Sequence, residues 1–492
     1  MRASTPVAWA DVELRLSRSL WDVVRREVLG DADSGIEAGA GVLFCGIVRT
    51  PRCTRLLGRE FVRAVDGVDY VDSAVGHGAL AAGFTLDAAL RAESEGLIPL
   101  FVHGHDGDRT VGFSQTDLDS HRRGYPALAL NANGPIGALV VARRAVEIDL
   151  YFPGGVNVRN GRAVVVGSTI ERFGSGRQGT VPGVRAADRH ARLFGEVGLR
   201  VLAGSKVVVI GAGGVGILLI QWLSMLGIGQ LVVIDPGRVK EESRSRLPGA
   251  TRRDARGGDS RRRGPEPLLR AFGLVGTQKV LLAKRLARKS AMGTNVTAIH
   301  SVVADPVARR ELIDSDFIVL AADSDAARYA ANRLAHQYLV PMVQAGSKVQ
   351  RRDDGTVADV FAVTRPVLPD QGCLRCAGLY SAAGLSYETA IGVNAGQRDY
   401  GTGEPAPSVA GLNAIAASLA VAFVQFSLTG LRRAGDADNL FVSPLDDELG
   451  SGVSSRDPAC PICGDAGVTG WGDLKSHRIP SPQPSGSRST TM

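Results

Sequence analysis

Apolar and polar positions alternate in blocks through the second half of the chain, as in buried strands with covering helices. Val207–Ile210 and Leu231–Ile234 are uninterrupted apolar runs of the kind found in strands buried on both faces. Similar runs follow at Val296–Val303, Asp316–Ala322 and Val340–Gln344, with helical patterns between them. This alternation predicts an α/β fold with a doubly wound, mostly parallel sheet, whose ligand lies at the carboxyl ends of the strands.

The N-terminal part has shorter apolar runs bounded by glycines, which predict a mixed α/β domain over residues 1–172. The expected strands are 41–46, Ile98–Val102, Gly137–Ala142 and Val146–Phe152.

Composition shifts mark the remaining boundaries. Residues 173–186 are rich in Gly, Ser and Thr and are predicted to be a linker. The second domain then covers 187–470, beginning with a helix at Asp188–Leu202 and including another helix from 276 through Lys289. The Ser/Pro-rich residues 471–492 are predicted to be a disordered tail.

The overall composition fits a soluble globular protein: of 492 residues, 44% are hydrophobic and 22% are charged. The net charge of +7 permits an acidic partner, but an aromatic content of 5% argues against a base-stacking surface for nucleic acid. Ser408–Gly430 is uncharged and about long enough to span a bilayer, yet Asn413 and Gln425 favour a buried core or dimer helix. With no apolar signal core at the N-terminus, we expect a cytoplasmic protein and no membrane partner.

A glycine fingerprint follows the first buried strand. Gly211, Gly213, Gly214 and Gly216 form a GxGGxG turn at the start of a helix, and Asp235 ends the next strand. Such glycines let the backbone approach a phosphate at the positive end of a helix, and the acid can accept hydrogen bonds from a ribose. The pattern indicates a Rossmann-like nucleotide site but leaves NAD and ATP equally open.

Two charged residues favour ATP. Lys279 opens a helix, where a compact positive charge suits a phosphate. Asp323 ends a strand, where a carboxylate suits Mg²⁺. A nicotinamide dehydrogenase does not need this pair, although either residue alone would more often be a solvated surface charge.

Four of the six cysteines form two CxxC pairs, Cys373 with Cys376 and Cys460 with Cys463. Two such knuckles are typical of a tetrahedral zinc site with four cysteine ligands, and no other residue near them suggests catalysis. We therefore predict that these four cysteines bind a structural zinc ion.

A second metal site is predicted in the N-terminal domain. His103 and His105 would point to the same side of a strand end, and Asp117 at the start of the next helix could complete a three-ligand zinc site. A separate glutamate could act as base and Ser114 as an oxyanion donor. The alternative is two surface histidines beside an N-cap serine.

This segment, over roughly residues 30–165, resembles the JAMM (MPN) metalloprotease domain, particularly its bacterial form. The resemblance rests on the HxH pair, on FSQTDL at 113–118 and on HRRGYPAL at 121–128. It implies that His103, His105 and Asp117 bind catalytic zinc, that Glu37 is the general base and that Ser114 is the oxyanion donor.

Residues 185–465 resemble the ThiF/MoeB/HesA family, relatives of ubiquitin-activating enzymes. The motifs are RHARLFG at 189–195, GAGGVG at 211–216, the paired CxxC motifs, PSVxxLN at 407–413, and Asp235, Arg246, Lys279, Asp323 and Arg328. The resemblance implies adenylation, with MgATP, of the C-terminal glycine of a small ubiquitin-like protein. It assigns the glycines to the nucleotide, Asp235 to the ribose, Arg246 and Lys279 to the phosphates, Asp323 to magnesium and Arg189 to the partner subunit's ATP in a homodimer.

Together these resemblances predict an enzyme that adenylates a ubiquitin-like or sulfur-carrier protein ending in Gly-Gly, fused to a metalloprotease that processes the same protein. Two alternatives stay open: an NAD(P)-dependent oxidoreductase, and a non-catalytic scaffold of two degenerate domains. The predicted cofactors are ATP, Mg²⁺ and Zn²⁺.

Overall fold

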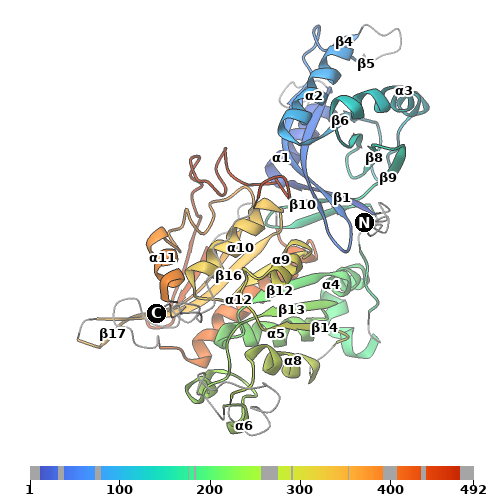
Figure 1. Cartoon of the computed structure of the whole chain (residues 1–492). Coiled ribbons are helices and arrows are strands. Elements are labelled where there is room, and N and C mark those ends of the chain that lie inside the picture. The colour runs from blue at the N-terminus through green and yellow to red at the C-terminus, as the bar shows by residue number, and fades with distance from the viewer. Residues whose placement is uncertain are drawn as a thin grey trace, which may run out of the picture. The chain divides into compact units, whose positions relative to one another are not determined.

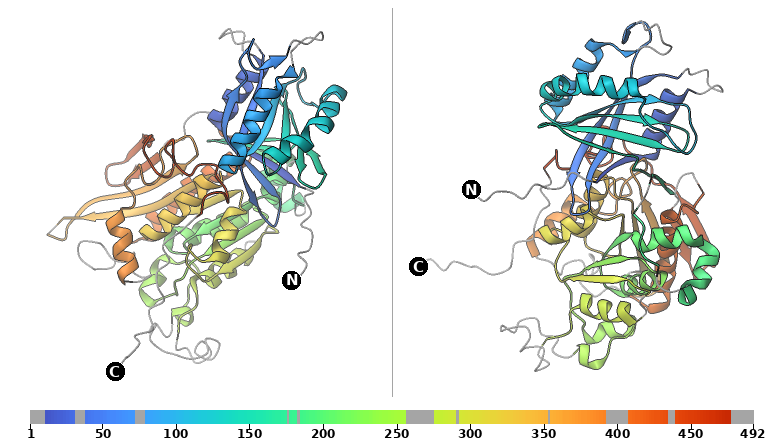
Figure 2. Two further views of the ribbon diagram at one scale, coloured as in Figure 1. Left: turned by 45° about the horizontal axis from the view of Figure 1, so that its top comes forward. Right: turned by 90° about the vertical axis from the view of Figure 1, so that its right-hand side faces the viewer.

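The computed structural model describes residues 11–30, 38–71, 79–174, 177–181, 184–255, 275–289, 292–352, 354–391, 407–433 and 439–476 (Figures 1 and 2). The chain forms two compact units, which we describe separately. Unit 1 comprises Met1–Gly176, Gln337–Leu339 and Val468–Ser476; unit 2 comprises Arg177–His336, Val340–Gly467 and His477–Met492.

Unit 1 contains, among its described residues, a nine-stranded mixed sheet in the order β11-β10-β1-β3-β2-β6-β7-β8-β9. Its strands are β1 (Val12–Ser17), β2 (Ala40–Arg49), β3 (Thr54–Arg63), β6 (Ile98–Gly104), β7 (Ile136–Val141), β8 (Val146–Phe152), β9 (Val156–Asn160), β10 (Ala163–Val166) and β11 (Ile170–Phe173). Its helices are α1 (Arg18–Leu29), α2 (Ala82–Glu95) and α3 (Gln115–Asn131), and β4 (Tyr70–Val71) pairs with β5 (Ala79–Leu80).

Helices cover both faces of this sheet because the side chains of its central strands alternate between two cores. In β2, Leu43 and Cys45 join the core that contains Trp21 of α1. Val42 and Phe44, which point the other way, join the core formed with α2 and α3. The result is a three-layer α/β/α arrangement, as the mixed α/β prediction for this part of the chain requires (Figure 2).

The segment Val468–Ser476 belongs to unit 1, although the sequence suggested a disordered tail from residue 471. Trp471 and Leu474 pack against the core of α2 and α3. The backbone is also tied down, because Asp473 N–H donates to the Ile47 carbonyl at 2.9 Å. An apolar anchor within a polar stretch explains the difference at residues 471–476; residues 477–492 lie outside the described part of the chain.

A network of buried charges joins β1, β3 and the residue that precedes β10. Glu13, which is 3% exposed, accepts hydrogen bonds from Arg15 at 2.8 Å and Arg55 at 3.1 Å. Its second oxygen accepts one from Arg162 at 2.5 Å. Burial by itself raises the pKa of Glu13, but the charges of the three arginines outweigh burial and hold that pKa well below 4.5.

We expect Glu13→Gln to destabilise unit 1 by about 3–5 kcal/mol, because it leaves buried arginine charge without a counter-ion. Because the pKa of Glu13 is lowered in the folded state, the stability that its ionised carboxylate provides is fully present above pH 4.5. That stability is lost as the pH falls through the folded-state pKa. Hydrogen exchange of β1 amides in the full chain would measure the effect. Glu171→Gln is the matched control, since the more exposed Arg18–Glu171 pair should contribute about 1 kcal/mol or less.

Unit 2 contains, within the described ranges, an eight-stranded sheet in the order β14-β13-β12-β15-β16-β17-β18-β19. Its strands are β12 (Lys206–Ile210), β13 (Gln230–Ile234), β14 (Asn295–Ile299), β15 (Phe317–Leu320), β16 (Met342–Arg351), β17 (Val357–Val367), β18 (Asn439–Ser443) and β19 (Glu448–Gly452). Its helices are α4 (Val184–Gly204), α5 (Gly214–Leu226), α6 (Arg252–Ala255), α8 (Lys279–Lys289), α9 (Pro306–Ile313), α10 (Asp325–Gln337), α11 (Ala382–Ile391) and α12 (Ala410–Leu428), with a 3-10 turn η1 (Glu241–Arg246).

The predicted Rossmann-like core is confirmed, and the sheet is more mixed than predicted. In the spatial order β14-β13-β12-β15-β16, neighbouring strands pair in parallel, as the apolar runs indicated. Strands β17 to β19 extend the sheet by antiparallel pairing, and the apolar runs did not predict these three strands. The first helix, α4, is interrupted at Gly195, whose φ of 65° is left-handed.

Helix α12 is, among the described helices, the one long and apolar enough to cross a bilayer by length and composition. Half of its apolar window is buried inside the protein, and it packs on α5, β16 and β17. These contacts agree with the predicted buried core helix. The cytoplasmic location stays a prediction.

Candidate functional sites

The glycine turn between β12 and α5 is shaped for close approach by a ligand. Gly211 has φ 96°, and a Cβ there would lie 2.7 Å from the Ala321 carbonyl oxygen. A Cβ on Gly216 would collide with the Gly211 carbonyl, whereas one on Gly213 would meet nothing within 4 Å. Because no side chain caps α5 at Gly213, its first backbone N–H groups remain available to an anion.

Asp235 stabilises this turn through two hydrogen bonds. Its Oδ2 accepts the N–H of Ala212 at 2.7 Å, and its Oδ1 accepts the N–H of Gly237 at 2.6 Å. Each carboxylate oxygen has a further lone pair, so the residue can still accept a hydrogen bond from a ribose hydroxyl.

Lys279 and Asp323 lie at the same edge of the sheet as Asp235. The charged groups of Asp235 and Lys279 lie close together beside Gly237. A Cβ built on that glycine would be 2.9 Å from Asp235 Oδ1 and 3.1 Å from Lys279 Nζ. The pKa of Asp323 is raised, chiefly because burial removes water from its carboxyl group, although part of the residue is exposed. Arg328 and Lys279 oppose that rise and Asp235 adds to it, so these three charges lie near enough to act on Asp323.

Arg246 and Asn413 border the other side of the turn. A Cβ on Gly214 would collide with the Asn413 amide and lie 3.5 Å from Arg246 Cδ. Asn413 is buried and accepts a hydrogen bond from Ser347 Oγ at 2.7 Å, which fixes it beside the glycines. Arg189 is exposed on α4 and makes no hydrogen bond or ion pair within the described residues.

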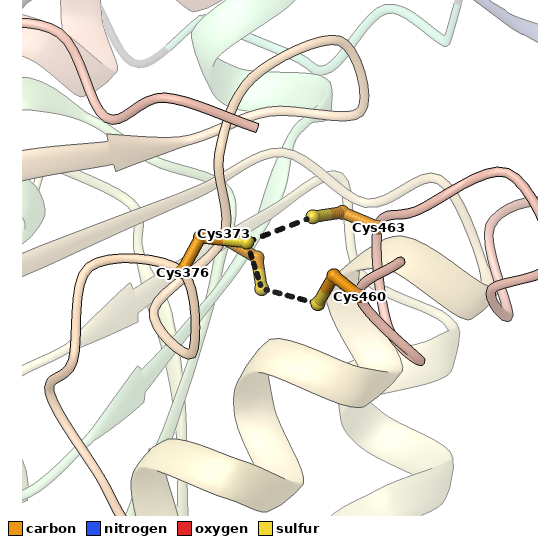
Figure 3. Close-up of side chains that lie close together, drawn as sticks. All are labelled: Cys373, Cys376, Cys460 and Cys463. Carbon is orange, nitrogen blue, oxygen red and sulfur yellow. Dashed lines mark hydrogen bonds between the residues drawn. The ribbon is translucent and has the colours of Figure 1, made fainter. Parts of the chain in front are cut away.

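The four paired cysteines meet, as predicted (Figure 3). The Sγ–Sγ distances are 3.9 Å for Cys373–Cys376, 3.7 Å for Cys373–Cys460 and 3.5 Å for Cys376–Cys463. A tetrahedral ion with Zn–S bonds of about 2.3 Å places its sulfurs about 3.8 Å apart. The sulfur spacing therefore fits zinc, and a tight turn helps to form the second knuckle, where Gly464 N–H donates to the Cys460 carbonyl at 2.8 Å.

His103, His105 and Asp117 also converge, and their positions fit a metal ion. The two Nε2 atoms are 3.1 Å apart and lie 3.6 and 3.4 Å from the Asp117 carboxylate oxygens. Zinc bonds of about 2.0–2.2 Å would separate such ligands by about 3.4 Å. His105 Nδ1 lies 3.0 Å from the Gly112 carbonyl, which accepts its proton and leaves Nε2 free for a metal.

Ser114 has a structural role beside this His/His/Asp cluster. It is the N-cap of α3: its hydroxyl donates to Asp117 Oδ2 at 2.7 Å and accepts the Asp117 N–H at 3.2 Å. To serve as an oxyanion donor, its hydroxyl would have to leave Asp117. The expected base, Glu37, lies outside the described residues.

Sequence reasoning missed Glu147, a second glutamate near the cluster. The registers pair His103 with Val140 and Val140 with Glu147, so the three side chains stand on one face of the sheet. Glu147 Oε2 also accepts the N–H of Phe113 at 3.1 Å. Only the strand order β6-β7-β8 reveals this neighbour, because the two residues are 44 positions apart in a sequence with no motif joining them.

Comparison with known proteins finds one matching family and several similar proteins. The sequence pattern of the ThiF family matches residues 187–441. The SAMP-activating enzyme E1 of Haloferax volcanii is 24% identical over 295 residues, covering 58% of this chain and 92% of that protein. Among solved structures, E. coli MccB with ATP is 21% identical, with 57% of this chain and 74% of that chain covered and a TM-score of 0.42. PaaA is 19% identical, with 55% and 73% covered and a TM-score of 0.37.

Proposed function

Because the chain belongs to the ThiF family, we propose that unit 2 adenylates the C-terminal carboxylate of a ubiquitin-like or sulfur-carrier protein ending in Gly-Gly. The observation that carries the proposal is the gathering of the glycine turn, Asp235, Lys279 and Asp323 at the carboxyl ends of the parallel strands. The name of the Haloferax relative, which describes an enzyme that activates SAMP, supports a small protein as the substrate.

In this proposal each group at the edge of the sheet has one task. The N–H groups at the start of α5 hold nucleotide phosphates, and Asp235 holds the ribose. A carboxylate oxygen of the substrate attacks the α-phosphorus of ATP, and pyrophosphate leaves. Lys279 and Arg246 stabilise the charge that develops on the phosphates. Asp323 would hold Mg²⁺, which supplies further charge neutralisation.

ATP–pyrophosphate exchange tests this proposal. The full chain should incorporate labelled pyrophosphate into ATP when it is given the correct member of a panel of purified ubiquitin-like and sulfur-carrier proteins ending in Gly-Gly. Exchange should vanish when the final glycine of that protein is deleted. Binding of NAD(P) with no exchange across the panel would instead favour an oxidoreductase, and neither activity would favour a scaffold.

We further propose that unit 2 releases its acyl group to an external thiol or sulfur donor. Residues 377–407, where a transferring cysteine would be expected, contain no cysteine. Of the two thiols outside the CxxC pairs, Cys45 and Cys53, both are buried, and burial raises the pKa of Cys45. An acyl-adenylate is therefore the last intermediate formed on this chain. Arg189, which is exposed and makes no ion pair with the residues that the structure describes, would reach the ATP of a second copy in a homodimer.

For unit 1 we propose a metalloprotease of the JAMM type that cleaves next to the same Gly-Gly. The convergence of His103, His105 and Asp117 at metal-ligand spacing supports this second function. Zinc held there would polarise the scissile carbonyl and acidify a bound water. Glu37 would take the proton of the attacking water and pass it to the leaving amine.

We expect Glu37→Gln to keep its zinc and lose at least about 100-fold in cleavage, because the change removes only the base. Asp117→Ala should lose both zinc and cleavage. The substrate is a ubiquitin-like protein extended beyond Gly-Gly by a short peptide, and the readouts are peptide release and metal content. Undiminished cleavage by Glu37→Gln would move the role to Glu147, which stands on the same face of the sheet as His103.

A further inference from the structure

The first turn of α10 is capped by a carboxylate from a distant part of the chain. Asp325 N–H donates to Glu388 Oε1 at 2.9 Å, and Ala326 N–H donates to Glu388 Oε2 at 2.8 Å. Ala327 N–H donates to the hydroxyl of Ser324 at 3.2 Å. The first three N–H groups of the helix are therefore all paired, and a negative charge lies at its positive end.

The contact between α10 and α11 is built from both sides. Glu388 of α11 is 5% exposed and lies 63 residues from Asp325 in the chain. In return, Asp325 Oδ2 accepts the N–H of Ser381, the residue before α11, at 3.3 Å. A Cβ on Gly384 would collide with Asp325 Oδ2, so glycine is needed for this close approach. The start of α10 is thus fixed against α11.

The starts of α10 and α5 differ, although both helices begin at the same end of the sheet. They follow β15 and β12, which pair in parallel. No side chain caps α5 at Gly213, and the proposed function assigns its N–H groups to nucleotide phosphates. The N–H groups of α10 are already occupied by Glu388, so they do not attract another anion.

Asp323 is the anion that an uncapped α10 would attract. It lies two residues before the helix, and aspartate is among the residues that cap helix N-termini best. A carboxylate drawn onto the helix would turn its oxygens away from a metal ion. Glu388 prevents this by supplying a different carboxylate to the same N–H groups.

We infer that Glu388 is a positioning residue for the proposed magnesium site, because its occupation of the α10 N-terminus leaves the Asp323 carboxylate available to the ion. The inference rests on the adenylation function proposed above. Mg²⁺ requires near-ideal octahedral geometry, so a small rotation of a carboxylate ligand weakens binding. Groups outside the ligand set that orient a ligand commonly change metal affinity 10–100-fold.

Binding of a non-hydrolysable ATP analogue to the full chain, measured by calorimetry with and without Mg²⁺, tests this role without turnover. Glu388→Ala should reduce the gain in affinity that Mg²⁺ provides about 10–100-fold and leave binding without Mg²⁺ unchanged. Glu388→Gln keeps one acceptor oxygen and should lose less, which gives a milder variant if Glu388→Ala does not fold. In an Asp323→Ala background, Glu388→Ala should have no further effect on the magnesium-dependent gain.

Asp305→Ala is the matched control. Asp305 caps α9 by accepting the N–H groups of Val307 at 2.8 Å and Ala308 at 3.4 Å. Its loss should lower the melting temperature and leave the magnesium-dependent gain unchanged.

The outcomes separate the inference from the function on which it rests. A wild type with neither pyrophosphate exchange nor magnesium-dependent binding of the analogue overturns both. A wild type that exchanges, with an undiminished magnesium effect in the Glu388 variants, overturns the inference alone. Equal losses with and without Mg²⁺, or a loss that persists in the Asp323→Ala background, would show that Glu388 only stabilises the fold.

Discussion

Asp323→Ala should abolish ATP–pyrophosphate exchange by this protein, and Lys279→Ala should reduce it by a factor of about 10²–10³. In the proposed site Asp323 would hold magnesium, because it follows β15 at the edge where Lys279 and Asp235 also lie. Without it, the charge that develops on the phosphates loses its metal counter-charge. Lys279 contributes one further positive charge from the start of α8.

The controls for this experiment come from the same elements. Lys289→Ala removes an exposed lysine at the other end of α8 and should leave exchange unchanged. Glu196→Ala removes an exposed carboxylate of α4 and should also leave exchange unchanged. Normal exchange in Asp323→Ala would show that this carboxylate is not the magnesium ligand and would refute the assignment of residues made above. Equal losses in Lys279→Ala and Lys289→Ala would indicate non-specific damage.

Loss of zinc from the four-cysteine site should unfold much of unit 2. Zinc contributes an apparent binding free energy of about 10–16 kcal/mol to small zinc-dependent domains, which is comparable to the whole stability of a typical domain. Cys373 and Cys460 come from segments 87 residues apart, so a zinc ion bound there would join the loop after β17 to the loop after β19. We expect Cys373→Ser to lower the melting temperature and the soluble yield sharply rather than to change chemistry selectively.

Metal content and thermal unfolding measure this second effect together. Purified without chelator, the full chain should carry about one zinc at this site, and Cys373→Ser should lose it. Cys53→Ser, outside both knuckles, should retain the metal in unit 2. A Cys373→Ser variant with wild-type zinc content and melting temperature would exclude a structural zinc site. If instead it folded normally and failed only in acyl transfer, the cysteines would have a chemical role.

Much of the candidate nucleotide site could be predicted from sequence because its signals are local. The apolar run Val207–Ile210, the glycines after it and the acid at 235 are close in the chain, and each has one structural meaning in that context. The CxxC pairs are similar: two ligands three residues apart form a knuckle wherever the chain carries it. The HxH pair likewise points both side chains to one side of a strand end.

The sequence by itself determined the strands and helices of the Rossmann-like core, the glycine turn and the two candidate sets of metal ligands, because these depend on neighbouring residues. Only the tertiary structure decided which distant residues complete them. Glu147 joins the histidine cluster through strand order, Trp471 returns to unit 1, and Arg15 and Arg55 become buried although arginine is usually exposed. Strand pairing and helix packing join residues far apart in the chain, and no local pattern encodes which partner each will meet.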